Sequence, residues 1–222
     1  MIVAIDGPAA TGKSTSAKLV AQKLGFTYLD TGAMYRCVTL SVLEQNFDLN
    51  DKKSLIFLLD SMEIKFKKSG SKTLVFLNRK DVSNDIRKTA VTSHVSAVSS
   101  IKEVRDFLVK NQRKIAKSNN CVVEGRDIGT IVFPEAEIKF FLVADMSIRA
   151  KRRQLELLKL GEKKSLDVLI KEIQKRDDLD SNRENSPLTK ANDAIKVDTT
   201  NMTINSQIEY IVNRVKLITI GN

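Results

Sequence analysis

A phosphate-binding loop near the start of the chain constrains its fold more than any other feature. Residues 7–15 read GPAATGKST and match the pattern G-x-x-x-x-G-K-[ST] at every fixed position. The loop follows the apolar run 2–5 and precedes a helical pattern that ends at Gly25. In such strand–loop–helix units, backbone N–H groups point at phosphate oxygens and the lysine reaches the terminal phosphates. The alternative, a glycine-rich turn with a chance Lys-Ser pair, does not explain this context. The motif predicts nucleoside triphosphate binding and leaves the use of the phosphate open.

Apolar and helical segments alternate along the rest of the chain. The sequence predicts strands at 2–5, 26–29, 121–123, 138–143 and 194–197. It predicts helices at about 13–24, 33–45, 51–60, 88–99, 101–117, 147–160, 165–178 and 204–218. This alternation is typical of an α/β fold in which helices flank a mostly parallel sheet. Residues at about 60–87 depart from it, because apolar residues recur at every second position before a turn at 68–71. They predict a hairpin inserted into a single domain.

Composition narrows the class of protein. The 222 residues contain no apolar run of about 18 or more, so we expect no transmembrane helix. The N-terminus does not follow the residue order of a signal peptide. Cys37 and Cys121 are far apart, and His94 is the only histidine. We therefore expect reduced thiols, a cytoplasmic protein and no zinc site.

The net charge of +10 is concentrated in one segment. Residues 149–176 hold ten lysines and arginines and four acids. A solvated helix face is one explanation of such a charge run. However, Arg149, Arg152 and Arg153 lie within about one helical turn, and the planar guanidinium group suits phosphate. The segment could therefore bind nucleic acid or a smaller phosphorylated ligand.

The remaining motifs argue against a switch or a motor. The guanine-binding pattern N-K-x-D and the pattern D-x-x-G, which a GTPase would use, are both missing. The predicted strand 121–123 is followed by EGRD, which places Arg126 between Glu124 and Asp127. Because ligands bind beyond the carboxyl ends of strands in open α/β sheets, this arrangement is typical of substrate recognition.

Two further clusters supply groups for a second ligand. LDTGAMYR at 29–36 places Asp30, Thr31 and Arg36 where a predicted strand meets a helix, although Asp30-Thr31 could be only a helix cap. KRDDLDSNR at 175–183 gathers arginines and acids into one polar turn, although these could be only a surface network. Arginines for an anion and acids for sugar or base edges together favour transfer of phosphate to a second phosphorylated substrate.

The chain resembles the bacterial cytidylate kinases, which are nucleoside monophosphate (NMP) kinases. The matching segments are IDGPAATGKST, LDTGAMYR, VVEGRDIGTIVFPEA, IRAKRR and KRDDLDSNRENSPL, which follow the family order from residue 5 to 188. IKVDTTNMTI continues the pattern nearly to the C-terminus. The resemblance implies a P-loop kinase domain over 1–222. Its core would be 1–59, 88–147 and 179–222, with an NMP-binding insert at about 60–87 and a helical lid at about 148–178.

The resemblance also implies the reaction and its residues. The γ-phosphoryl group of ATP would pass to CMP or dCMP with Mg²⁺, in pyrimidine nucleotide metabolism. The implied ATP-binding residues are Gly7, Pro8, Ala9, Ala10, Thr11, Gly12, Lys13, Ser14, Thr15 and Arg152. The implied CMP-binding residues are Asp30, Thr31, Arg36, Ser96, Arg105, Arg126, Asp127, Arg176, Asp180 and Arg183. The implied catalytic residues are Lys13, Arg126, Arg149, Arg153 and Arg183, and the implied metal ligand is Ser14.

Individual roles follow the chemistry of these side chains. Thr31, Arg36 and Arg126 would hold the CMP phosphate, with Arg183 close by. Asp127, Ser96 and Arg105 would read the cytosine edge, because a carboxylate accepts from the 4-amino group. Arg176 and Asp180 would face the sugar hydroxyls. The basic segment would then be a lid over ATP.

Three positions depart from the family pattern, and two other functions stay open. Ser14 stands where many members carry glycine, so either Ser14 or Thr15 could bind Mg²⁺. Glu124 stands where aspartate is commoner, and Thr31 where serine is commoner. The nearer rival is a kinase for UMP, AMP or shikimate, and the other is a basic P-loop protein that binds nucleic acid. The absence of tryptophan disfavours the latter. We expect a monomer with ATP and CMP or dCMP as substrates, and with no nucleic-acid or membrane partner.

Overall fold

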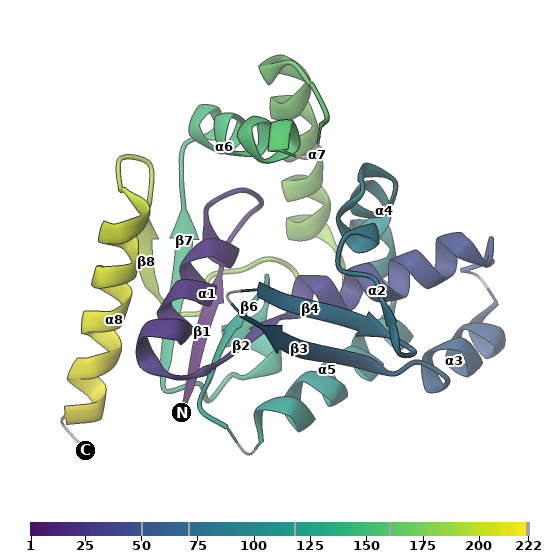
Figure 1. Ribbon diagram of the computed structural model, residues 1–222, viewed down its shortest axis with the longest axis horizontal. Helices are drawn as coiled ribbons and strands as arrows, with labels where there is room; N and C mark the ends of the chain where they lie inside the picture. Colours follow the sequence, from purple (N-terminus) through teal and green to yellow (C-terminus); the bar gives the residue numbers. More distant parts are fainter. Residues whose placement is uncertain (50, 71, 118, 160, 221–222) are drawn as a thin grey trace. The chain divides into compact units, whose positions relative to one another are not determined.

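The computed structural model describes residues 1–49, 51–70, 72–117, 119–159 and 161–220 (Figure 1). They form two compact units, Met1–Asp30 with Arg113–Asn222, and Thr31–Gln112, called the first and second unit below. Ser71 of the predicted turn and Leu160 of a predicted helix lie outside the described residues. The division into core, NMP-binding insert and lid stays a prediction.

A parallel sheet forms the centre of the first unit. Its strands lie in the order β2-β6-β1-β7-β8, and all four pairings are parallel. The strands are β1 Ile2–Asp6, β2 Thr27–Asp30, β6 Cys121–Glu124, β7 Ile138–Val143 and β8 Ile195–Asp198. Branched and aromatic side chains fill these strands because helices cover a parallel sheet and bury it. The predicted α/β class is therefore confirmed, and each observed strand lies within one residue of its predicted bounds.

Helices of the first unit bury the sheet and carry the basic segment. They are α1 Lys13–Leu24, α6 Met146–Lys159, α7 Leu166–Asn182 and α8 Ile204–Ile220, and α5 Lys102–Ala116 crosses the boundary between the units. α1 and α8 lie side by side and pack with Val3, Phe140 and Val197 of the sheet into one hydrophobic core (Figure 1). α7 continues to Asn182, beyond its predicted end at 178. Residues 175–182 are therefore the last turns of a helix, and the predicted polar turn at 175–183 is wrong.

The second unit is built from helices and an antiparallel sheet. Its elements are α2 Thr31–Glu44, α3 Lys52–Asp60, β3 Ile64–Ser69, β4 Lys72–Leu77, β5 Lys80–Asp81, a 3₁₀ turn at Asp85–Arg87 and α4 Thr89–Ser99. The predicted hairpin is present as β3 and β4, with Ile64 opposite Leu77 and Phe66 opposite Val75. The sequence reading missed β5, since two exposed residues carry no periodic signal.

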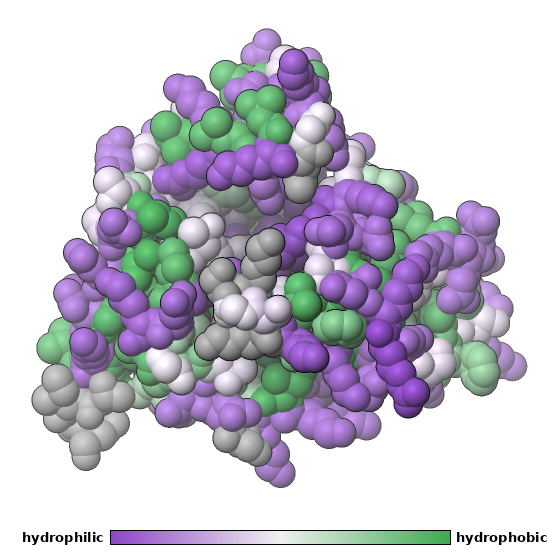
Figure 2. All heavy atoms as spheres, viewed as in Figure 1, coloured by the Kyte–Doolittle hydropathy of each residue, from purple (hydrophilic) through white to green (hydrophobic). Residues whose placement is uncertain are grey.

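The surface over α6 and α7 mixes hydrophobic and hydrophilic side chains. Figure 2 shows hydrophobic side chains among hydrophilic ones over α6 and α7, and Leu155 of α6 is 60% exposed. Within the described ranges, no helix combines the length and the hydropathy that crossing a membrane requires.

Candidate active site

The phosphate loop, residues 7–15, has a backbone that requires glycine at its first position. Gly7 has a φ of +145°, and a Cβ atom there would lie 2.2 Å from the carbonyl oxygen of Leu142. Gly12 has a φ of +92°, which disfavours any L side chain. Both glycines of the motif therefore serve the turn that brings backbone N–H groups toward a bound anion.

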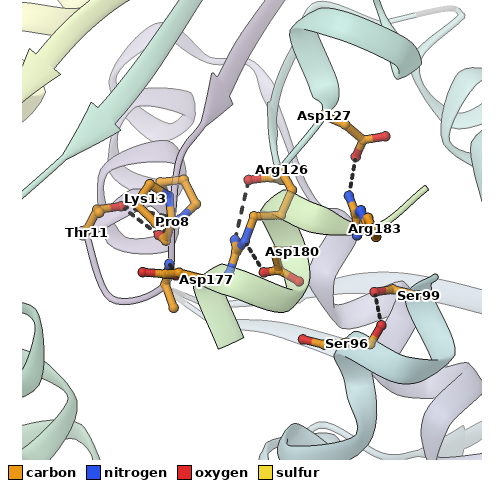
Figure 3. A network of polar contacts seen from close by, with 12 residues as sticks. Pro8, Thr11, Lys13, Ser96, Ser99, Arg126, Asp127, Asp177, Asp180 and Arg183 are labelled. Carbon is orange, nitrogen blue, oxygen red and sulfur yellow. Dashed lines mark hydrogen bonds and ion pairs between the residues drawn. The ribbon is translucent and has the colours of Figure 1, made fainter. Parts of the chain in front are cut away.

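Lys13 is buried at the start of α1 with backbone partners. Its Nζ atom donates to the carbonyl oxygen of Pro8 at 2.5 Å and contacts Thr11 Oγ1 at 3.3 Å (Figure 3). Burial lowers its pKa, and the nearby positive charges of Arg126 and Arg176 lower it further. Cations that repel one another in a buried place favour binding of an anion, because a phosphate would compensate their charge.

Two carboxylates lie side by side at the carboxyl ends of β2 and β6. The register pairs Asp30 with Glu124. Glu124 accepts hydrogen bonds from Ser14 Oγ at 2.8 Å and from the Tyr28 hydroxyl. Burial raises the pKa of Glu124, and the charge of Asp30 raises it further. A bound cation would relieve this repulsion.

These oxygen atoms fit Mg²⁺ better than a soft metal. Mg²⁺ prefers oxygen ligands and binds through one or two carboxylates together with substrate phosphates and water. Ser14 and Glu124 supply a hydroxyl and a carboxylate beside the phosphate loop. Over the described residues, no three His, Cys, Asp or Glu side chains gather as a metal site of their own.

Asp6 joins the phosphate loop to the segment that follows β6. It is the last residue of β1 and directly precedes Gly7. Its carboxylate accepts from the backbone N–H groups of Ile128 at 2.9 Å and Gly129 at 2.8 Å. These residues open a π-helical turn, a distortion that is frequent at functional sites. Burial raises the pKa of Asp6 to about 6. The sequence reading missed this residue, although an acid at the end of an apolar strand could have signalled it.

The EGRD segment, residues 124–127, is held by ion pairs to α7 and the residue after it. Arg126 Nε donates to Asp180 Oδ2 at 2.9 Å, and Arg183 lies 3.8 Å from Asp127 (Figure 3). Both side chains of the second pair are 5% exposed. Burial acts to raise the pKa of Asp180, but the charges of Arg126 and Arg176 outweigh it and lower the pKa. Four of the predicted site residues thus meet in two ion pairs.

Two of the three predicted arginines of α6 contact the phosphate loop. Arg149 donates to the carbonyl oxygen of Ala9 at 3.2 Å. Arg152 donates to the carbonyl oxygen of Thr11 at 3.2 Å and to that of Thr199 at 2.6 Å. Arg153 instead pairs with Glu156 on its own helix. The Thr199 hydroxyl also donates to Thr11, and no motif in the sequence indicated that role.

Two predicted site residues of the second unit, Ser96 and Arg105, belong to a compact group of side chains from three helices. The Arg105 guanidinium of α5 lies 5.5 Å from the ring centre of Tyr35 on α2 and donates to the carbonyl oxygen of Ser99 at 3.2 Å. The Ser99 hydroxyl donates in turn to the carbonyl oxygen of Ser96, on α4 (Figure 3). Thr31 and Arg36 lie on α2. Their roles in substrate binding stay predictions.

Comparisons with known proteins show which family the sequence matches. A family model described as cytidylate kinase matches residues 3–217. The chain is 51% identical over 216 residues to the cytidylate kinase of Halalkalibacterium halodurans, covering 97% of each chain. It is 48% identical over 219 residues to that of Caldanaerobacter subterraneus subsp. tengcongensis, covering 99% of this chain and 96% of the other.

A solved structure supports the fold alone. An uncharacterized protein from Eubacterium ventriosum is 14% identical, with a TM-score of 0.52 and coverage of 97% of this chain and 98% of the other. The family match and the two relatives span nearly the whole chain and confirm the resemblance seen in its motifs. The chain belongs to the cytidylate kinase family.

Proposed function

We propose that this protein transfers the γ-phosphoryl group of ATP to CMP or dCMP, giving ADP and CDP or dCDP. Family membership supports the reaction, and one structural observation carries it. Lys13 is buried in the phosphate loop, and the charges of Arg126 and Arg176 act on it. This arrangement suits phosphoryl transfer, in which catalysis consists mainly of positioning and charge compensation.

The phosphate loop binds the donor. Backbone N–H groups of residues 7–15 surround the phosphates of ATP, Lys13 binds its terminal phosphates, and Arg152 closes the loop from α6. Ser14, which donates to Glu124 at 2.8 Å, would hold Mg²⁺ with that carboxylate beside it. Mg²⁺ bound there would compensate negative charge on the phosphates of ATP.

The acceptor nucleotide is bound by its phosphate, base and sugar. Arg126, Arg36, Thr31 and Arg183 bind the phosphate, since guanidinium groups bind it through two hydrogen bonds. Asp127 accepts from the 4-amino group of cytosine, and Asp30, Ser96 and Arg105 contribute to the nucleotide site. Arg176 and Asp180 bind the sugar hydroxyls. These assignments rest on the family resemblance and on the chemistry of each side chain.

The transfer itself needs no general base. A phosphate oxygen of CMP forms a bond to the γ-phosphorus while the bond to the bridging oxygen of ADP breaks. The acceptor oxygen is already anionic, so no proton has to leave. Arg149 and Arg153 of the lid compensate charge on the moving phosphoryl group, and lid closure excludes water that would hydrolyse ATP. We propose a monomer that works in the cytoplasm, where its two buried cysteines stay reduced.

Release of ADP with a panel of acceptors tests this function. With ATP and Mg²⁺, CMP and dCMP should stimulate ADP release far more than UMP, AMP or shikimate, and chelation of Mg²⁺ should abolish it. Preference for another acceptor would refute the cytidylate assignment. Salt-dependent RNA or DNA binding without acceptor-stimulated turnover would favour a nucleic-acid-binding protein instead.

A further inference from the structure

Asp177 of α7 connects the phosphate loop to α6 and has no part in the mechanism above. Its Oδ1 atom accepts from the backbone N–H of Ala9 at 3.1 Å, and its Oδ2 atom pairs with Arg149. Arg149 in turn donates to the carbonyl oxygen of Ala9 at 3.2 Å. The three contacts close a ring of polar groups from the loop, α6 and α7. Asp177 lies close to the phosphate loop in Figure 3.

The ring is surrounded by apolar side chains, so each of its two charges depends on the other for compensation. The side chain of Arg149 is 8% exposed and that of Asp177 is 13% exposed. Ala9 packs in one hydrophobic cluster with Ala150 and Leu157 of α6 and with Leu169 and Ile173 of α7. Where water is excluded, losing one member of an ion pair leaves the other charge uncompensated.

The ring leaves part of the Arg149 guanidinium group for a ligand. Its Nη1 atom makes both contacts of the ring. Among the residues that the structure describes, its Nη2 atom contacts only a weak acceptor, Met146 Sδ, at 3.5 Å. Across the described part of the chain, its buried Nε atom has no hydrogen-bond partner. One edge of the group is thus fixed to the loop, while two nitrogen atoms keep donors that no oxygen of the described residues accepts.

We propose that Asp177 is a positioning residue that fixes Arg149 on the phosphate loop, with its remaining nitrogen atoms turned to the transferred phosphoryl group. This inference rests on the proposed phosphoryl transfer from ATP. Asp177 itself touches no substrate. It sets the angle of the guanidinium plane, and it compensates the arginine charge before ATP binds. Because both oxygens of its carboxylate are used, neither an amide nor a shorter side chain can replace it fully.

Kinetics of Asp177→Asn, alone and combined with Arg149→Gln, test the proposal. The amide keeps one acceptor oxygen for Ala9 but turns a donor toward the guanidinium group. We expect kcat to fall about 100-fold, the loss typical of a catalytic group displaced by about 1 Å. The KM for CMP should change little, since Asp177 does not touch the acceptor. Asp178→Asn, an exposed neighbour on the same helix, is the matched control and should keep wild-type kcat.

The double variant separates positioning from a general loss of structure. If Asp177 acts through Arg149, adding Asp177→Asn to Arg149→Gln should lower kcat no further, because the group to be positioned is gone. A further tenfold loss, or wild-type kcat in Asp177→Asn alone, would overturn the proposal. Comparing Arg149→Gln with the double variant gives this answer even if Asp177→Asn alone unfolds. Wild-type activity on CMP tests the proposed function separately, since it does not depend on either substitution.

Discussion

The phosphate loop and the EGRD segment both gather cations at strand ends but hold them with different partners. At the loop, Lys13 and Arg152 donate to the backbone carbonyl oxygens of Pro8 and Thr11. Arg149 donates to that of Ala9 and also pairs with a carboxylate, that of Asp177. At the segment, Arg126 pairs with the carboxylate of Asp180, and Asp127 pairs with Arg183.

These different partners leave the phosphate loop and the EGRD segment with different net charges. A carbonyl oxygen orients a cation without cancelling its charge, so Lys13 and Arg152 keep a positive field for a triphosphate, while Asp177 compensates the charge of Arg149. A carboxylate cancels the charge, so an acceptor phosphate that binds Arg126 has to share it with Asp180. The loop is therefore suited to strong attraction of the donor, and the segment to selection among acceptors.

Among these predictions, removing the Arg126 guanidinium group of the EGRD segment should have the largest effect on activity. Arg126→Ala should lower kcat about 10³-fold, the lower end for an arginine that compensates transition-state charge. Turnover of ATP with CMP measures it. Arg214→Ala, an exposed arginine of α8, is the control and should stay near wild type. Near-normal activity in a folded Arg126→Ala variant would remove the segment from the acceptor site.

The amino-acid sequence could predict the phosphate loop, the strands and the family, but not which residues each site side chain contacts. The loop, the five strands and the family followed from local motifs and periodicity, which depend on neighbouring residues. The contacts of Asp6 with Ile128 and Gly129 join residues more than 120 positions apart, and only the packing of the sheet brings them together. For the same reason no pattern distinguished Arg149 and Arg152, which contact the loop, from Arg153, which pairs along its helix.

Asp6 lies between the two regions and should make stability depend on pH. Its folded-state pKa of about 6 exceeds the ordinary 3.8, because it is buried near Asp127. The folded protein therefore binds the proton more tightly, and this contribution to stability is lost as pH rises through 6. The difference in unfolding free energy between the wild type and Asp6→Asn should fall by about 3 kcal/mol between acidic pH and pH 7. Urea unfolding across that range measures it.

A constant difference between the two proteins would contradict this prediction. It would mean that the backbone N–H groups of Ile128 and Gly129, which lower the pKa of Asp6, together with the charge of Lys13, fully offset the burial. Asp6 would then resemble Asp180 of the other region, whose pKa is lowered by nearby arginine charges in spite of its burial.

Selectivity should depend on the second acid of the segment. Asp127→Ala should reduce the preference for CMP over UMP about tenfold, because only cytosine offers a 4-amino donor to the carboxylate. The ratio of kcat/KM values for the two acceptors measures this. Asp178→Asn serves again as control. An unchanged ratio would leave Asp127 with no role beyond its ion pair with Arg183. It would also argue against the EGRD segment as the region that selects the acceptor.

The smallest effect should come from the hydroxyl at the end of the phosphate loop. Ser14 donates to Glu124 at 2.8 Å, which places it at the one point where the loop and the EGRD segment contact a common cation in the proposed mechanism. Ser14→Ala should raise the Mg²⁺ concentration for half-maximal activity about fivefold, the cost of roughly one hydrogen bond. Thr15→Ala should change it less, and titration of both variants with Mg²⁺ at fixed ATP compares them. A larger shift for Thr15→Ala would indicate that Mg²⁺ binds at Thr15, away from Glu124. The phosphate loop would then bind the ion without a contribution from the EGRD segment.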